Sequence, residues 1–212
     1  MKFLLISDLH ENIDAFKWIN PLEDQVDEVL FLGDVSNCAS DEKAIEILKM
    51  FKKKVYFIPG NLDMKTLPEA ASEVTHSVHG KAFEINGIKF AALGGSNPTI
   101  FDTPFELSEK DIENMLDPIS SEGMVLMTHA PSHGIHDKIT IGLHVGSPAV
   151  KKIVEKYKPI VALSGHIHEA FGIKEKNGTL FINPGPAKED HAAILEIKDG
   201  KASAWMVGPA DL

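Results

Sequence analysis

The chain has 212 residues, 43% of them hydrophobic and 25% charged, which is typical of an ordinary globular protein. Its formal net charge of −10 argues against a general nucleic-acid-binding surface. The single Cys38 excludes an internal disulfide and a thiolate metal cluster, and no apolar run is long enough to span a membrane.

The N-terminal part of the chain alternates between apolar runs and amphipathic runs. Strands are predicted at 2–7, 29–34 and 55–61, and amphipathic helices at 12–20 and 41–51. This alternation is typical of a parallel α/β arrangement. The apolar run 2–7 is too short for the core of a signal peptide, and no small-residue cleavage site follows it, so we expect a cytoplasmic protein.

The rest of the chain predicts hairpins together with further strands and helices. Asn-Gly and Asp-Gly pairs predict hairpin turns at 86–87, 177–178 and 199–200. The remaining predicted elements are helices at 108–116 and 146–157, and strands that run into loops within 123–131 and 159–168. Because no repeat or linker interrupts this pattern, we predict one α/β domain, residues 1–212, with two mixed sheets packed face to face and helices outside.

Polar side chains that can bind metals follow five of the predicted strands, at the point where each strand ends. In open α/β sheets, ligands bind beyond the carboxyl ends of the strands, so these side chains should converge on one crevice. They are Asp8, His10, Asp34, Asn61, His129, His166 and His168.

The donor types indicate a divalent metal centre. Carboxylate, amide and imidazole groups together suit Mn, Fe, Zn, Co or Ni. Seven ligands exceed what one ion needs, whereas two ions that share a carboxylate explain the number. All 21 basic residues are Lys, so phosphate would have to be bound by a metal, a Lys or backbone N–H groups rather than by a guanidinium fork.

Each of these signals also has an ordinary structural explanation. Taken alone, Asp-x-His or His-x-His is usually a surface pair, and Asn61 after Gly60 or Asp34 after Gly33 fits a turn. The conjunction favours a shared site, because every signal lies at a strand end and Gly33, Gly60 and Gly165 stand beside three of them.

Five short segments carry a resemblance to a known family. They are SDLH (7–10), GD (33–34), GNLD (60–63), THAP (128–131) and SGHIH (164–168). In this order they resemble the calcineurin-like metallophosphoesterases, whose signature runs Asp-x-His, Gly-Asp, Gly-Asn-His-Asp or Glu, a His, and Gly-His-x-His. Segments 94–109 and 143–159 are similar to a compact branch related to cyclic-nucleotide phosphodiesterases.

The resemblance implies a four-layer αββα sandwich and a centre of two divalent metal ions, with Mn the expected choice in vitro. It implies one ion held by Asp8, His10 and His168, a second held by Asn61, His129 and His166, and Asp34 as the bridge. It also implies in-line attack on phosphorus by a metal-bridging hydroxide, with Asp34, Asn61 and His129 as the residues closest to catalysis.

Leu62 departs from the family pattern, which usually has a His at this position. That His is associated with contacting the phosphate or protonating the leaving oxygen, and Leu62 can do neither. Either another residue supplies the acid, with His133, His136 and His144 as candidates, or the enzyme prefers leaving groups that depart unaided. Asp63 is expected to orient neighbouring groups.

The expected function is therefore hydrolysis of a phosphate ester, in particular a small phosphodiester or nucleotide. We expect a small phosphate-ester substrate and neither a membrane nor a nucleic-acid partner, while a homodimer stays open. A nuclease is the alternative enzyme, and a non-catalytic scaffold with this fold is the alternative from another class. Asn97, Phe101 and Phe105 lie in a Pro-rich loop that either lines the pocket or simply packs.

Overall fold

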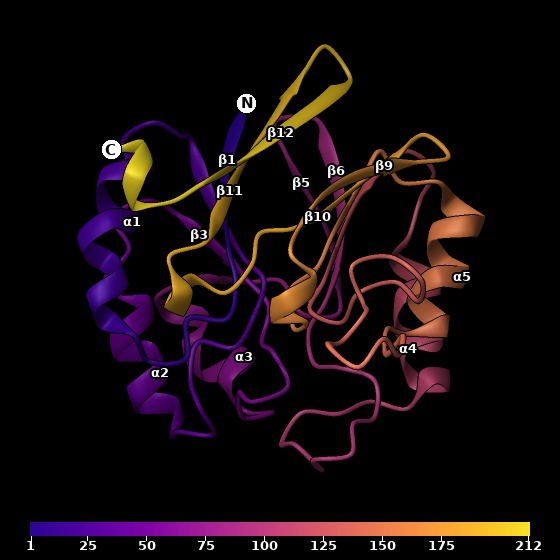
Figure 1. Cartoon of the computed structure of the whole chain (residues 1–212), viewed down its shortest axis with the longest axis horizontal. Helices are drawn as coiled ribbons and strands as arrows, with labels where there is room; N and C mark the ends of the chain where they lie inside the picture. Colours follow the sequence, from indigo (N-terminus) through magenta and orange to yellow (C-terminus); the bar gives the residue numbers. More distant parts are fainter.

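The computed structural model describes residues 1–212 and consists of two sheets packed face to face between two layers of helices (Figure 1). The strands of the first sheet are β1 (Lys2–Ile6), β2 (Glu28–Phe31), β3 (Val55–Phe57), β4 (His76–Ser77), β11 (Ala192–Lys198) and β12 (Lys201–Val207). Those of the second are β5 (Lys81–Ile85), β6 (Ile88–Leu93), β7 (Val125–Thr128), β8 (Val161–Leu163), β9 (Gly172–Lys176) and β10 (Thr179–Asn183).

Both sheets are mixed, as predicted. The strand order is β12-β11-β1-β2-β3-β4 in the first sheet and β5-β6-β7-β8-β10-β9 in the second. Strands β1 to β4 are mutually parallel, and so are β6, β7, β8 and β10. The antiparallel pairs are β11 with β1 and with β12, β5 with β6, and β9 with β10. The three predicted hairpins supply β5–β6, β9–β10 and β11–β12.

Helices cover the outer face of each sheet (Figure 1). The α-helices are α1 (Phe16–Glu23), α2 (Asp41–Leu48), α3 (Leu67–Ala70), α4 (Glu109–Leu116) and α5 (Pro148–Tyr157). The 3-10 turns are η1 (Ile13–Ala15), η2 (Ala71–Glu73), η3 (Asp117–Ile119), η4 (His168–Ala170), η5 (Ala187–Glu189) and η6 (Pro209–Asp211). Ser108 and Ser147 cap α4 and α5 by accepting hydrogen bonds from Asp111 N–H and Val150 N–H. No helix in this fold has both the length and the apolar character that crossing a membrane would require.

Three hydrophobic clusters separate the four layers. Along β1, Leu4 and Ile6 pack against α1 and α2, whereas Phe3 and Leu5 point to the other sheet, because successive side chains of a strand alternate between its faces. A third cluster joins the outer face of the second sheet to α4 and α5. The fold is thus the four-layer αββα sandwich.

The structure adds two elements that periodicity did not predict. Helix α3 has only four residues and β4 only two, so neither is long enough to show a helical or strand period. Strand β4 joins the first sheet by pairing in parallel with β3. Both lie between β3 and the hairpin that opens the second sheet.

Candidate metal centre

The loops after β1, β2, β3, β7 and β8 meet where the two sheets come together, and they bring the seven predicted ligands into one cluster. The fit between these loops is tight at two glycines. A Cβ on Gly60 would overlap the side chain and N–H of Asp34, and a Cβ on Gly165 would overlap Ser7. Glycine at both positions therefore lets the backbone of one loop approach its neighbour.

Four of the predicted ligands occupy left-handed backbone conformations. The φ angles are 54° at Asp8, 48° at His10, 56° at Asp34 and 68° at His166. Residues other than glycine rarely adopt such angles, and where they do the surrounding structure has to enforce the conformation. The strain coincides with the cluster of metal-capable side chains, which is the usual place for it in proteins with a functional site.

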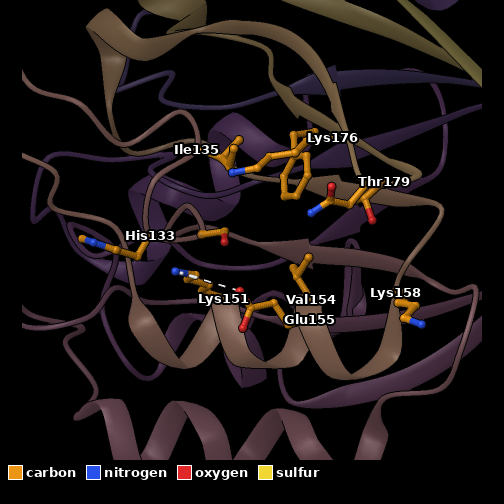
Figure 2. A pocket seen from close by; sticks show the side chains of 11 residues that line it. His133, Ile135, Lys151, Val154, Glu155, Lys158, Lys176 and Thr179 are labelled. Atoms are coloured by element: carbon orange, nitrogen blue, oxygen red, sulfur yellow. Dashed lines mark ion pairs between the residues drawn. The ribbon is translucent and has the colours of Figure 1, made fainter.

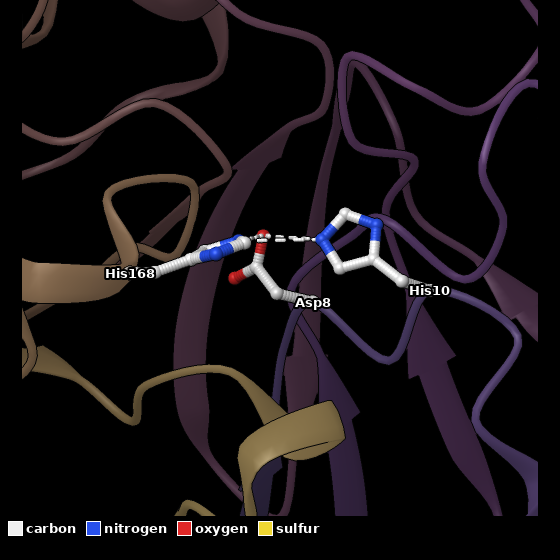
Figure 3. A group of neighbouring side chains, drawn as sticks. All are labelled: Asp8, His10 and His168. Carbon is white, nitrogen blue, oxygen red and sulfur yellow. Dashed lines mark hydrogen bonds and ion pairs between the residues drawn. The ribbon is translucent and has the colours of Figure 1, made fainter.

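Asp8, His10 and His168 form the first group (Figure 3). The His10 Nε2 and His168 Nε2 atoms lie 3.2 Å apart, and they are 3.8 and 3.3 Å from Asp8 Oδ1. His10 Nδ1 is buried and has no hydrogen-bond partner. Two imidazole nitrogens that face each other across a buried carboxylate oxygen form a donor set suited to a divalent cation.

Asn61, His129 and His166 form the second group. The Nδ1–H of His129 donates to the Leu32 carbonyl at 2.7 Å, which turns Nε2 toward Asn61 Oδ1 at 3.0 Å. A backbone carbonyl on one ring nitrogen is the usual way to orient the other nitrogen toward a metal. The rings of His129 and His166 lie with their centroids 5.1 Å apart, and the N–H of His166 donates to Asp8 Oδ2 at 3.1 Å.

Asp34 lies between the two groups. Its Oδ2 atom is 4.0 Å from His10 Nε2 and 3.5 Å from His129 Nε2, so one oxygen faces both sets of imidazoles. Its Oδ1 atom accepts a hydrogen bond from Leu62 N–H at 2.8 Å. Leu62 thus supports the site through its backbone, and this contact does not depend on its side chain. Asp8 also approaches Asp34 and His129 closely enough to share a cation with them.

Buried carboxylates give the cluster an affinity for positive charge. Burial alone would lower the pKa of His129, but the charges of Asp34 and Asp8 outweigh burial and raise it to about 9. Burial also opposes ionisation of Asp8, yet a hydrogen bond to His168 and the charge of His129 hold the Asp8 pKa well below its usual range. The pKa of His166 shifts in the opposite direction to that of His129, because burial and the neighbouring charge of His129 lower it to about 4. The residues therefore fit divalent cations, which would satisfy the carboxylates and use neutral imidazoles as ligands.

Asp63 holds the loops after β2 and β3 together. It is fully buried, and its carboxylate accepts hydrogen bonds from Val35 N–H (3.3 Å), Ser36 N–H (3.0 Å), the Ser36 hydroxyl (3.2 Å) and Gly60 N–H (2.8 Å). Because these groups flank Asp34 and Asn61, Asp63 positions both ligands from behind the site.

Thr103 and Glu106 orient Asn61, and sequence reasoning did not identify them. Asn61 Nδ2 donates to Thr103 Oγ1 at 3.1 Å, and the Thr103 hydroxyl donates in turn to Glu106 Oε1 at 2.7 Å. With its nitrogen held in this way, Asn61 keeps its oxygen on the side of His129. The relay could not be read from the sequence, because Thr103 lies 42 positions from Asn61 and belongs to no known motif of the chain.

A cleft opens above the cluster. It is lined by five of the predicted ligands, His10, Asp34, Asn61, His166 and His168, while His129 and Asp8 lie deeper and are buried. The other lining residues are Cys38, Leu62, Phe101, Asp102, Thr103 and Pro104. Phe101 therefore lines the cleft, as one of the two interpretations of its loop anticipated, whereas Phe105 is buried in packing.

None of the three candidate substitute acids lines this cleft. His144 and His133 instead face the buried carboxylate of Asp137, at 2.7 and 3.6 Å. His136 Nδ1–H donates to the Ala170 carbonyl at 2.8 Å. His133 also lines a separate cavity beside α5, with Lys151, Lys158 and Lys176 on its walls, which contains no predicted metal ligand (Figure 2).

Residues 1–200 match the family model described as the calcineurin-like phosphoesterase superfamily domain. An uncharacterized protein of Methanocaldococcus jannaschii is 30% identical over 195 residues, a match that covers 88% of each chain.

Solved structures share the fold. A dimetal phosphatase from Danio rerio superposes with a TM-score of 0.68 at 14% identity, over 99% of this chain and 96% of that one. A structure described as a novel archaeal phosphodiesterase superposes with a TM-score of 0.59 at 15% identity, over 98% of this chain and 100% of that one. At these identities the similarity concerns the fold alone.

Proposed function

Because the chain belongs to the calcineurin-like phosphoesterase superfamily, we propose that it is a dinuclear metal-dependent hydrolase of a small phosphodiester or nucleotide. The observation that supports this most directly is the position of Asp34 Oδ2 between His10 Nε2 and His129 Nε2. A carboxylate that faces two sets of imidazoles is the arrangement that a pair of ions sharing one ligand requires.

The residues divide into two ligand sets joined by Asp34. Asp8, His10 and His168 would hold one ion, and Asn61, His129 and His166 would hold the other, with Mn, Fe, Zn, Co or Ni compatible with these donors. Two such ions supply positive charge for the phosphoryl oxygens and lower the pKa of a water molecule. The two superposed structures are described as a dimetal phosphatase and a phosphodiesterase, which is consistent with this chemistry.

The chain's own residues orient these groups. Leu62 N–H fixes one oxygen of Asp34, Thr103 fixes the amide of Asn61, and the Leu32 carbonyl fixes the His129 ring. Such preorganisation keeps the donors in place when a phosphate ester binds.

No imidazole other than the proposed ligands lines the cleft, and Leu62 cannot donate a proton from its side chain. We therefore favour the second of the two interpretations of Leu62, in which the substrate's leaving group departs without a protein acid. Esters of acidic alcohols or phenols meet this requirement, because their oxyanions are stable in water.

The test is hydrolysis of bis(4-nitrophenyl) phosphate by the purified protein. The protein is first stripped of metal and reloaded with Mn²⁺, and the bound metal is measured by elemental analysis. Asp34→Ala is expected to reduce activity at least about a thousandfold and to weaken Mn²⁺ binding. Asp14→Ala, which removes an exposed carboxylate paired only with Lys17, is the matched control and should retain activity. A wild-type chain that binds no Mn²⁺ and hydrolyses no ester would favour the scaffold alternative.

A further inference from the structure

Part of the lining of the cleft, its apolar wall, adjoins the metal-capable groups. Leu62, Phe101 and Pro104 supply this wall, and the cleft has a volume of about 510 Å³, within the usual range for a small-molecule site. Phe101 is 77% exposed to solvent. An exposed phenyl ring beside a candidate active site is a surface on which a flat or apolar group of a ligand can be buried.

The loop that carries Phe101 has a defined conformation. The carboxylate of Glu106 accepts four hydrogen bonds, from the N–H and hydroxyl groups of Thr99 and of Thr103. Phe101 N–H donates to Thr99 Oγ1 at 3.0 Å, so the residue is tied to the same network. The loop is also bonded to the metal-centre loop, because Phe105 N–H donates to the Asn61 carbonyl at 3.0 Å. Because the backbone that carries the ring is held in this way, little backbone entropy is lost when a ligand packs on the ring.

The charges around the cleft limit what can bind there. No Lys lines it, and the chain has no Arg. Two Lys residues lie close by without lining the cleft. Lys188 Nζ is 4.0 Å from Glu189 Oε1, and Lys65 Nζ is 5.8 Å from the centroid of the Phe105 ring. The one charged side chain on the wall is Asp102, a carboxylate. A second or third phosphate would therefore find no cation on this wall and would approach a negative charge.

From these three observations we propose that the cleft contains an aromatic-binding subsite, formed by Phe101 with Leu62 and Pro104, that selects esters of a single phosphate carrying an aromatic group. The subsite deepens the hydrolase proposed above and rests on that function for its substrate. It also predicts that nucleoside triphosphates and other polyphosphate chains bind poorly, whatever their organic group.

The experiment is calorimetric titration of the Mn²⁺-loaded chain with phenylphosphonate and methylphosphonate, which share one anionic head and resist hydrolysis. We expect phenylphosphonate to bind roughly five- to tenfold more tightly in the wild type. Phe101→Ala should remove this preference, and Trp205→Ala, an exposed aromatic residue in β12 at a distance from the cleft, should retain it. Methylenediphosphonate, titrated with Mn²⁺ in excess, should bind no more tightly than methylphosphonate.

Each outcome separates this inference from the proposed function. Equal binding of the phenyl and methyl compounds by the wild type, or a preference that survives in Phe101→Ala, overturns the subsite. Tighter binding of the diphosphonate overturns the single-phosphate selection. Because the readout is binding, these results stand whether or not the chain hydrolyses bis(4-nitrophenyl) phosphate, and loss of turnover with the phenyl preference intact would count against the hydrolase alone.

Discussion

Glu106 offers a sharp test of how the loop beside the cleft supports the metal centre. Four donors converge on its carboxylate, three of them on Oε1 and the Thr99 N–H on Oε2. Glu106→Gln keeps the shape of the side chain but replaces one oxygen by an NH₂ group. In its best orientation that group faces the Thr99 N–H, donor against donor.

The magnitude of the effect can be worked out in two ways. Burial opposes ionisation of Glu106, but the bonds from Thr99 and Thr103 outweigh it and lower the pKa from 4.5 to about 2, which corresponds to about 3 kcal/mol. Losing one bond to a charged group and leaving a donor unpaired costs about 1–3 kcal/mol. Because the carboxylate is partly exposed to water, we expect a decrease of about 2 kcal/mol in the free energy of unfolding.

Urea denaturation at pH 7 measures this difference, with the exposed Glu46→Gln as the control. Mn²⁺ titration should show roughly tenfold weaker binding in Glu106→Gln, because Thr103 no longer holds the Asn61 amide firmly. The folded-state pKa lies below the unfolded one, so the wild-type advantage is full above pH 4.5 and disappears as pH falls toward 2. A variant within about 0.5 kcal/mol of the wild type with unchanged Mn²⁺ affinity would refute the reasoning.

Three further predictions concern the cleft, the packing of its loops and the response to pH. Leu62→His restores the imidazole of the family signature at the cleft and should raise the ratio of kcat on alkyl esters to kcat on nitrophenyl esters by about tenfold or more. An unchanged ratio would show that a side chain at position 62 does not reach the leaving group. Gly60→Ala places a Cβ on Asp34 and should abolish Mn²⁺ binding measured by calorimetry, whereas Gly87→Ala, which has open space in a turn at φ 82°, should lose about 1 kcal/mol of stability and keep Mn²⁺. Burial lowers the pKa of His79 from 6.5 to about 4, so the free energy of unfolding should be highest above pH 6.5 and fall by about 2 kcal/mol as pH drops to 4. Urea denaturation of His79→Gln should show a smaller fall, and an equal dependence on pH in both proteins would contradict a role for His79.

The sequence was sufficient for the elements whose signals are local. Ser108 caps α4 at the start of the helix predicted at 108–116, and the Asn86-Gly87 pair turns the β5–β6 hairpin. The seven predicted ligands could be grouped in advance, because each follows an apolar strand and strand ends of parallel sheets share an edge.

Contacts between loops that are distant in sequence could not be predicted from the sequence. His133, His136 and His144 are close in sequence to His129, yet none of them lines the cleft, and His133 and His144 face Asp137 instead. The roles of Leu62 N–H, Thr103 and Glu106 depend on hydrogen bonds across 28 and 42 positions and on a backbone group that every residue possesses. Neither amino-acid composition nor hydrophobic periodicity indicates such contacts.

The ligands of the first group come from opposite ends of the chain, since Asp8 and His168 are separated by 160 positions. Closing so long a loop around an ion in an unfolded chain is entropically costly, so metal binding cannot nucleate folding here. The complete ligand set exists only once the two sheets have docked. Metal binding then takes place after the chain has folded. The ion that the protein carries should therefore follow the metals available after folding, and exchange of that ion should leave the fold intact.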